Sequence, residues 1–407
     1  MNWFHAIPPR QNSGSLKNNM MQEDNPHLPK DIVPFSAADM EFKNAPEIIQ
    51  AIKDFLDSEN GVLAYYGQHP GYAEAVADWM LRRHNWKIDP KWIVPGNGIL
   101  PSLYVAVDAF TNPQDNVIII TPVYDPFFSI VAGCGRNILT SDLIWNGERY
   151  VMNYEEIEKL AHNSNTTTLM LCSPHNPVGR VWSKEELERL ARICIENDVL
   201  ILNDEAHHDL ILPGFHHTCL ASISDEIAEH CITFTAPSKG FNLAGMQQSN
   251  TIIKNETMRN HYYKDVCLTK EYYTCNPLSY RACEAAYKTD GTWIDELNNV
   301  IDKNRQFATN YLKENIPEIH PMPMEGTYLL WLDCRALGLD RHELEKLNKE
   351  KAYLYLDEGY MFGEAGAGFV RWNLACHISV LEKGLERWKK AIDEWRKANE
   401  KKDSCTD

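Results

Sequence analysis

The sequence predicts an α/β protein whose mostly parallel sheet lies between layers of helix. Short apolar runs alternate along the chain with stretches of helical periodicity, which is the element order of that fold class. The runs are continuous rather than alternating, as expected of strands that helices cover on both faces. Five such runs are NVIII (116–120), TTLMLC (167–172), VLILN (199–203), CITFT (231–235) and SNTII (249–253).

Three helices are indicated by apolar spacing and by their first residues. Segment 46–56 begins with Pro46, a residue suited to the first turn of a helix, and segment 72–86 repeats the apolar spacing. Segment 183–197 opens with a capping box formed by Ser183 and Glu186. We expect all three helices to accompany the sheet.

The element order changes after about residue 290. A helix over 293–314 is followed by a strand over 326–334, a short helix, a strand over 369–374 and a closing amphipathic helix, which predicts a smaller α+β domain. Residues before 45 are polar and rich in Pro and Asn, so we expect an extended arm without a core element. The predicted domains are an N-terminal arm with part of the small domain (1–45), a large domain (46–288) and a C-terminal small domain (289–407).

Composition narrows the class of protein. The 407 residues include 40 Lys and Arg against 57 Asp and Glu, a formal net charge of -17, so we expect neither nucleic acid nor an anionic membrane as a partner. Eleven cysteines are scattered without a Cys-x-x-Cys pair, which is typical of a reducing compartment. No apolar run approaches the roughly 20 residues that span a bilayer, and the first residues do not resemble a signal peptide. These features predict a cytoplasmic protein.

Polar residues follow the ends of four predicted strands. Asp204 follows VLILN, Lys239 lies just after CITFT, Asn176 follows TTLMLC and Tyr124 follows NVIII. In open α/β sheets ligands bind beyond the carboxyl ends of the strands. We therefore expect these side chains, with His207, to form one site.

Lys239 and Asp204 suggest a particular chemistry. A lysine is most often a solvated surface residue, but at the end of a buried strand its amine loses water, which lowers its pKa and makes it able to form a Schiff base with a carbonyl. Asp204 alone could be a helix cap, and Asn176 alone a turn residue. Beside a Schiff-base lysine, a buried aspartate has the further role of holding a proton on the ring nitrogen of pyridoxal phosphate.

Several motifs together carry a resemblance to a known family. SAADMEF (36–42), GVLAYYG (61–67), PVYDPF (122–127), PHNPVGRVW (174–182), DEAHHD (204–209), APSKGFNLAG (236–245) and FVRWN (369–373) follow one another in the family's order. The chain resembles the pyridoxal-phosphate-dependent class I/II aminotransferase superfamily, and within it the cystathionine β-lyase or C–S lyase branch. The resemblance implies fold type I, in which residues 46–288 would be the domain that binds pyridoxal 5'-phosphate.

The resemblance also implies roles for individual residues around the cofactor. Lys239 would form the covalent link, Asp204 would bind the ring nitrogen, and Tyr124 would stack on the ring. Asn176 and His207 would flank the ring hydroxyl, with His207 where aminotransferases usually have tyrosine. The phosphate would be bound by neutral donors, because Gln247 replaces a frequent arginine; these donors are Ser238 and the backbone of Gly98, Ile99 and Leu100.

Substrate recognition and assembly follow from the same resemblance. Arg371 would bind the α-carboxylate of an L-amino acid, assisted by Asn176 and by the segment at Ala38. Tyr65 would reach the neighbouring subunit's site as a further catalytic and substrate-binding residue, which implies a homodimer with shared active sites. Tyr66 is the adjacent alternative to Tyr65.

The predicted activity is α,β-elimination from cysteine-type thioethers to pyruvate, ammonia and a thiol. A class I/II aminotransferase is the alternative, and a non-catalytic regulatory binding protein is a third hypothesis. Ser36, Ala64 and Tyr66 depart from the branch pattern and leave the identity of the substrate side chain open.

No metal site is expected from the sequence. His175, His207, His208, Asp204 and Asp209 superficially resemble ligands, but no H-E-x-x-H or Cys/His spacing accompanies them. His216 and His217 are expected in a loop.

Overall fold

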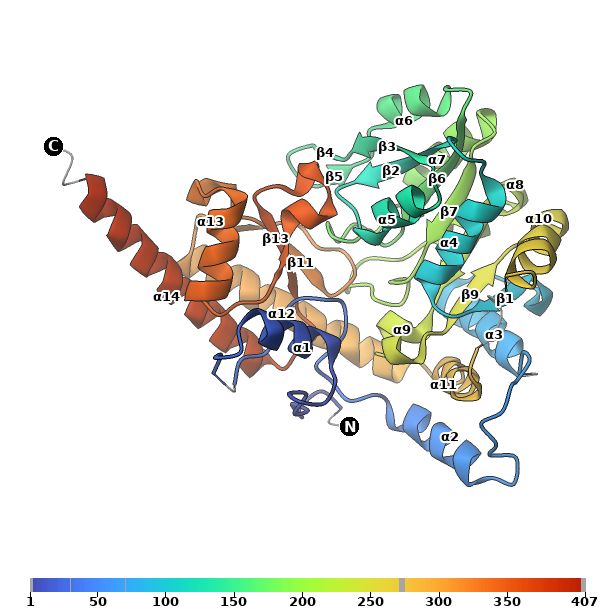
Figure 1. The fold of residues 1–407 in the computed structure, drawn as a ribbon, viewed down its shortest axis with the longest axis horizontal. Helices are drawn as coiled ribbons and strands as arrows, with labels where there is room; N and C mark the ends of the chain where they lie inside the picture. Colours follow the sequence, from blue (N-terminus) through green and yellow to red (C-terminus); the bar gives the residue numbers. More distant parts are fainter. Residues whose placement is uncertain (1–2, 30, 70, 271–274, 404–407) are drawn as a thin grey trace.

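The structure is a computed structural model that describes residues 3–29, 31–69, 71–270 and 275–403. Figure 1 shows a large sheet flanked by helices and, beside it, a smaller sheet packed near the two longest helices, α12 and α14. The predicted α/β class and the second α+β unit are both present. The residue boundaries of the domains remain a prediction.

The large sheet has seven strands in the order β1-β9-β8-β7-β6-β2-β3. β9 is antiparallel to both of its neighbours, and the other pairs are parallel, so the sheet is mixed. The five predicted strands are confirmed, and β1 and β3 are additional. The strands are β1 (Ile93–Gly96), β2 (Asn116–Thr121), β3 (Asn137–Asp142), β6 (Thr166–Cys172), β7 (Leu200–Asp204), β8 (Cys231–Thr235) and β9 (Ser249–Ile252).

Helices accompany this sheet, and the three predicted ones are confirmed. The capping box of Ser183 and Glu186 opens α7, and the helix predicted over 72–86 ends at His84 because Asn85 adopts a left-handed conformation (φ 51°). The helices are α2 (Pro46–Asp57), α3 (Tyr72–His84), α4 (Ile99–Phe110), α5 (Pro126–Gly133), α6 (Tyr154–Ala161), α7 (Lys184–Glu196), α8 (Asp225–Glu229), α9 (Pro237–Gly240), α10 (Glu256–Asn260) and α11 (Pro277–Tyr287). A hairpin of β4 (Ile144–Trp145) and β5 (Tyr150–Val151) extends beside β3.

The smaller sheet is antiparallel, in the order β10-β11-β13-β12. Its strand predicted over 326–334 begins later, at Leu329, because Thr327 has a left-handed backbone (φ 67°) and Gly326 forms a bridge to Ile211. The elements are β10 (His320–Pro321), β11 (Leu329–Asp333), β12 (Asp357–Glu358), β13 (Phe369–Asn373), α12 (Thr292–Asn315), α13 (Arg341–Lys346) and α14 (Ile378–Asp403). Single turns of 3₁₀ or π-helix join several of these elements.

The prediction for the N-terminal segment is wrong in one respect. It contains helix α1 (Leu16–Asp24), and the ammonium of its Lys17 is buried between Asp39 (2.8 Å) and Glu41 (2.6 Å). Arg10 binds the same two carboxylates at 2.8 and 3.0 Å. Ion pairs rather than an apolar stripe hold the helix in place, so the sequence has no amphipathic periodicity there.

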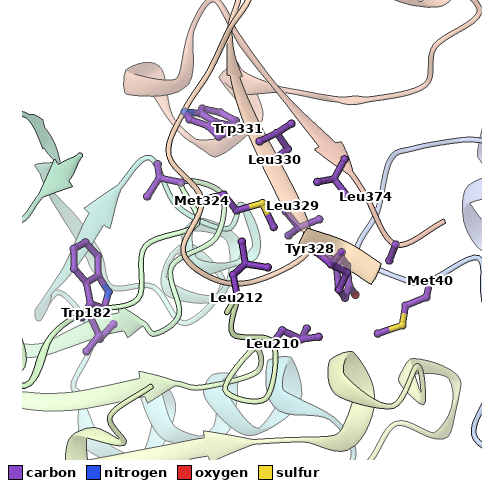
Figure 2. Close-up of a cluster of buried hydrophobic side chains, with 14 of the residues drawn as sticks. Met40, Trp182, Leu210, Leu212, Met324, Tyr328, Leu329, Leu330, Trp331 and Leu374 are labelled. Atoms are coloured by element: carbon purple, nitrogen blue, oxygen red, sulfur yellow. The ribbon is translucent and has the colours of Figure 1, made fainter. Parts of the chain in front are cut away.

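One apolar core connects the two sheets and the N-terminal segment. Figure 2 shows Tyr328 and Leu329 at the start of β11, with Met40 on one side and Leu210 and Leu212 beneath them. These five side chains are at most 2% exposed. The core therefore fixes the position of the small sheet relative to the strand ends of the large one. Within the described residues, no helix combines the length and apolar character needed to cross a membrane.

Candidate active site

The predicted site residues come together at one edge of the large sheet. β1, β2, β6, β7 and β8 run in the same direction, so their carboxyl ends lie at the same edge. Asp204 ends β7, and Lys239 lies in α9, four residues after the end of β8. Asn176 and Tyr124 follow β6 and β2, and the backbone amide of Tyr124 donates to the Asn176 carbonyl (3.1 Å).

Lys239 reaches from α9 to the N-terminal segment. Its Nζ donates a hydrogen bond to the backbone oxygen of Ala38 at 2.8 Å. Loss of water around the amine and the positive charge of Arg371 together lower the pKa of Lys239 to about 8, although the charges of Asp39 and Asp204 oppose the shift. A substantial fraction of the amine is therefore neutral near pH 8, which is the nucleophilic and basic form.

Asp204 is buried, with 4% of its surface exposed. Its Oδ1 accepts a hydrogen bond from the Ala206 amide (2.9 Å), and no other described residue donates to the carboxylate. Burial raises the pKa of Asp204 to about 6, although the Ala206 amide and the charge of Lys239 oppose the shift. Oδ2 thus remains available to a cationic N–H group.

Arg371 projects from β13 and is 4% exposed. Its Nη1 donates to Oδ1 of Asn176 (2.7 Å), while Nε and Nη2 donate to Oδ2 of Asp357 (3.2 and 2.6 Å). A guanidinium has five N–H donors, so one on each terminal nitrogen is still free. These two donors can bind a carboxylate bidentately.

His207 lies between the residues expected to hold the cofactor and the small sheet. Its ring packs edge-on against Tyr328, with centroids 5.8 Å apart. Burial, with the positive charges of Lys239 and Arg371, lowers the pKa of His207 well below its usual value, so the ring is neutral. Its buried Nδ1 has no hydrogen-bond partner among the described residues. A bound group with a complementary polar atom would satisfy it.

Tyr124 is close to the same charges. Burial raises the pKa of its phenol, and the charges of Arg371 and Asp204 act on it in opposite directions. The ring therefore stays neutral and can offer a flat apolar face to a ligand.

The residues predicted to bind phosphate lie at the start of α4 and in α9. Gly98 precedes α4 with φ 106° and provides no side-chain cap, so the first amides of the helix, including those of Ile99 and Leu100, lack an intrahelical partner. Ser238 is adjacent to Lys239 in α9. Gln247 is exposed. The neutral donors predicted for the phosphate are thus the backbone amides at the start of α4 and the hydroxyl of Ser238.

The remaining two predicted residues differ in their placement. Ala38 lies in the site, because its carbonyl accepts from Lys239 and also from the Tyr328 hydroxyl (2.7 Å). Tyr65 is fully exposed in the loop between α2 and α3, and Tyr66 donates to Asn60 (3.2 Å) in that loop. Figure 1 shows this loop projecting away from the strand ends.

Sequence reasoning missed Asp357 and Tyr328. Asp357 is paired with Arg371 across β12 and β13, and it also accepts from the Ala37 amide (3.1 Å). Tyr328 lies inside the motif GTYLLWLDC, where its apolar neighbours indicate only a strand. Asp357 could have been anticipated, because a buried arginine needs a carboxylate partner.

Comparisons with known proteins agree with this geometry. Residues 30–387 match the family model "Aminotransferase class I and II". The cystathionine beta-lyase PatB of Bacillus subtilis is 38% identical over 89% of this chain and 93% of its own length. The protein MalY of Escherichia coli is 29% identical, with 87% and 90% covered.

Solved structures show the same relationship. Cystalysin from Treponema denticola, whose structure contains pyridoxal 5'-phosphate, has a TM-score of 0.94 at 44% identity, covering 96% of this chain and 99% of its own. The pyridoxal-phosphate-bound C–S lyase from Staphylococcus hominis has a TM-score of 0.88 at 28% identity, with 96% and 97% covered. The predicted fold type I is confirmed, and the chain belongs to the aminotransferase class I and II family.

Proposed function

We propose that this chain is a pyridoxal-phosphate-dependent carbon–sulfur lyase that cleaves cysteine-type thioethers to pyruvate, ammonia and a thiol. The proposal depends on one observation: Lys239, Asp204 and Arg371 are gathered at one sheet edge of a chain 38% identical to a cystathionine β-lyase over 89% of its length. Its substrates are L-amino acids.

The groups of the site fit pyridoxal phosphate. Asp204 has a free oxygen for a protonated ring nitrogen, and His207 has an unpartnered Nδ1 near Lys239 and Arg371. The start of α4 and the Ser238 hydroxyl would bind the phosphate, and Tyr124 would cover the ring. When bound, the cofactor supplies an aldehyde that takes up amines and a ring that withdraws electrons from the bonds of Cα.

Lys239 would act first as the covalent anchor and then as the base. Its pKa of about 8 allows Nζ to be neutral, and a neutral Nζ can take the proton from Cα of the amino acid. The Ala38 carbonyl, which now accepts from Nζ, can orient the amine when it is released.

Arg371 would hold the amino acid by its carboxylate. The two N–H groups not used by Asp357 and Asn176 match the spacing of the two carboxylate oxygens. Because Asn176 accepts from Arg371 through Oδ1, its amide NH₂ remains available to a ring oxygen. The carboxylate and the ring are therefore held relative to each other by one asparagine.

Loss of the thiolate completes the elimination. A thiol of ordinary pKa, about 8.5, leaves as a thiolate without a strong acid. The elimination therefore demands no further proton donor from the site, whereas transamination requires a proton to be delivered back to the cofactor. This difference favours lysis for substrates with a β-thioether.

We also propose a homodimer. Tyr65 is fully exposed, and Val62 and Leu63 of the same loop are 58% and 64% exposed, which is unusual for three neighbouring apolar side chains. If a second copy of the chain covered this loop, Tyr65 would lie at the active site of that second copy. Location in the cytoplasm is the corresponding proposal for the environment, supported by ten free, buried cysteines among the described residues.

A product assay tests the function. Purified protein is incubated separately with L-cystathionine, with a cysteine S-conjugate, and with an amino acid plus 2-oxoglutarate, and the keto acid formed in each is identified. We expect pyruvate and ammonia from the thioethers without an added keto acid. Borohydride should also fix the cofactor to Lys239, as peptide mapping would show.

Two variants control this assay. Lys239→Ala should abolish pyruvate release, whereas Lys313→Ala, on the exposed face of α12, should not change it. If thioethers give no pyruvate while 2-oxoglutarate becomes glutamate, the protein is an aminotransferase. If neither reaction occurs in protein loaded with cofactor, the binding-protein hypothesis replaces both.

A further inference from the structure

A buried cluster of histidines and acidic residues lies next to the active site but contributes nothing to the chemistry described above. We call it the histidine cluster. Its members are at most 7% exposed and come from the end of α3, the segment after β7 and the loop that follows: His84, Glu205, His208, Asp209, His217 and Cys219. Burying this many polar groups is costly unless each has a partner.

The members form two groups of potential ligands. The first group is His84, His208 and Asp209, and the second is Glu205, His217 and Cys219; in each group the ligand atoms lie within 4.8 Å of one another. The groups adjoin, because the His84 ring centroid lies 4.8 Å from that of His208 and 5.7 Å from that of His217.

The proton on one ring nitrogen of His208 leaves the other nitrogen facing a carboxylate without a hydrogen bond. Its Nδ1 lies 2.7 Å from the Glu205 carbonyl oxygen, which only accepts, so Nδ1 must carry the proton. In a neutral ring Nε2 is then a lone pair, and it lies 3.3 Å from Oδ2 of Asp209 without a hydrogen bond. Two acceptors facing each other in a buried site require a positive charge between them.

A single extra proton does not satisfy the whole cluster. Both ring nitrogens of His217 and Oε2 of Glu205 also lack hydrogen-bond partners, although His217 Nε2 is only 3.2 Å from that oxygen. The His84 ring lies beside both of these histidines, with its centroid 4.8 Å from that of His208 and 5.7 Å from that of His217. Arg83, the nearby guanidinium, is paired with Asp295. Two buried carboxylates and three imidazoles thus share a site in which several polar atoms have no hydrogen-bond partner among the described residues.

We propose that the histidine cluster is a binding site for a divalent transition metal of the zinc type, with His84, His208 and Asp209 as ligands and His217 nearest to the fourth position. Imidazole nitrogens exclude calcium and magnesium, which prefer oxygen ligands, and suit zinc and its neighbours. Neutral rings are the form that binds metal. His84, which now uses Nε2 against Asp209 (2.9 Å), would move its proton to Nδ1.

The surroundings supply an entry path and a support. Four members of the cluster, His84, His208, Asp209 and His217, line a cavity of about 290 Å³, through which an ion can enter. Trp79 Nε1 donates to Oδ1 of Asp209 (3.0 Å), and Asn298 donates to the Asp209 carbonyl (2.9 Å), so the carboxylate is fixed before an ion arrives. The sequence concealed this site because its ligands at 84, 208 and 217 belong to no contiguous metal motif.

The site would act on structure rather than on the reacting atoms. A Cβ at Gly240, the residue after Lys239, would lie 3.2 Å from Oδ2 of Asp209, so the proposed ligand packs directly against the turn that carries the lysine. A metal there would tie α3 and the segment after β7 to that turn. This proposal does not depend on the reaction proposed above.

Metal binding can be measured on the full chain carrying its cofactor. Protein treated with a chelator is titrated with Zn²⁺, and bound metal is measured by elemental analysis; Co²⁺ is used in parallel because its visible absorption reports coordination. We expect about one equivalent per chain, with the spectrum of a four-coordinate ion. His208→Gln and His84→Gln should each lose this binding. His216→Gln, an exposed histidine in the same loop, should retain it.

Three outcomes would overturn the proposal. Wild-type protein that retains no more metal than His208→Gln would show that a proton, not a metal, lies between His208 and Asp209. Equal binding by wild type and both variants would place the metal elsewhere. If His208→Gln does not fold, His84→Gln and the effect of Zn²⁺ on the wild-type melting temperature decide, and no Zn²⁺-dependent stabilisation would again refute the site.

Discussion

Replacing Arg371 by lysine tests the substrate site most directly. Lysine keeps the charge but has one nitrogen instead of a planar fork, so it cannot bind a substrate carboxylate bidentately while it also satisfies Asp357 and Asn176. One charge-assisted hydrogen bond lost from a buried site costs about 2 kcal/mol. We therefore expect kcat/KM for L-cystathionine to fall roughly thirtyfold in Arg371→Lys.

The assay follows pyruvate release over a range of substrate concentrations, with bound cofactor measured from its visible absorption. Cofactor content should stay near the wild-type level, because the proposed cofactor contacts do not include Arg371. Arg335→Lys is the matched control, since Arg335 also binds a carboxylate with two nitrogens, Asp333 at 2.9 and 2.7 Å, but is 64% exposed. An unchanged kcat/KM in Arg371→Lys, or an equal loss in Arg335→Lys, would refute the assignment.

Three further predictions concern the carboxylates of the site. Asp204→Asn should retain cofactor but sharply slow exchange of the substrate's α-proton, and near-normal exchange would contradict its role at the ring nitrogen. In cofactor-free protein, burial raises the pKa of Asp204 from 3.8 to about 6, so its contribution to stability is present below about pH 4 and lost as the pH rises through about 6. In urea unfolding, the free energy of unfolding of Asp204→Asn should rise relative to that of the wild type by up to about 3 kcal/mol between about pH 4 and pH 7. A difference that stays constant with pH would contradict this. Asp357→Ala should lower the free energy of unfolding by about 3 kcal/mol, because Arg371 would be buried without its carboxylate. Asp78→Ala, which breaks an exposed ion pair, is the control, and an equal or smaller loss in Asp357→Ala would contradict this role of Asp357.

The fold was predictable where burial leaves a simple pattern. β2, β6, β7 and β8 are buried along nearly all of their length, and each contains a continuous apolar run; β9 is equally buried but begins with the polar residues Ser249, Asn250 and Thr251. β3 was missed because it is an edge strand with a single fully buried residue, and β1 because it has only four residues, including Pro95 and Gly96. A strand that is short or lies at the edge of the sheet forms the same backbone hydrogen bonds but leaves no continuous apolar run in the sequence.

The residues alone predicted the candidate site where they follow strand ends, whereas Arg371 and Ala38 were expected from the family resemblance. Lys239, Asp204, Asn176 and Tyr124 each follow a buried run, and the parallel direction of the strands brings them together. Asp357 follows no such run: its place beside Arg371 comes from the pairing of β12 with β13, which the sequence does not display. The histidine cluster is of the same kind, because its members meet only after α3 has packed beside the segment that follows β7.

The N-terminal segment connects these observations, because it closes the site over Lys239. Ala37 has a left-handed backbone (φ 55°), a conformation that costs a non-glycine residue about 1 to 2 kcal/mol. Its amide donates to Asp357, and its carbonyl accepts from Asn373 (2.7 Å).

These contacts offset the strain and turn the next carbonyl, that of Ala38, toward Lys239. The same Asp357 thus holds both Arg371, the proposed carboxylate-binding group, and the Ala37 amide, which precedes the carbonyl that accepts from Lys239. Ser36 precedes this fixed turn and is partly exposed. Since the backbone here is held from both sides, we expect a different side chain at position 36 to leave the Ala38 carbonyl and Lys239 in place.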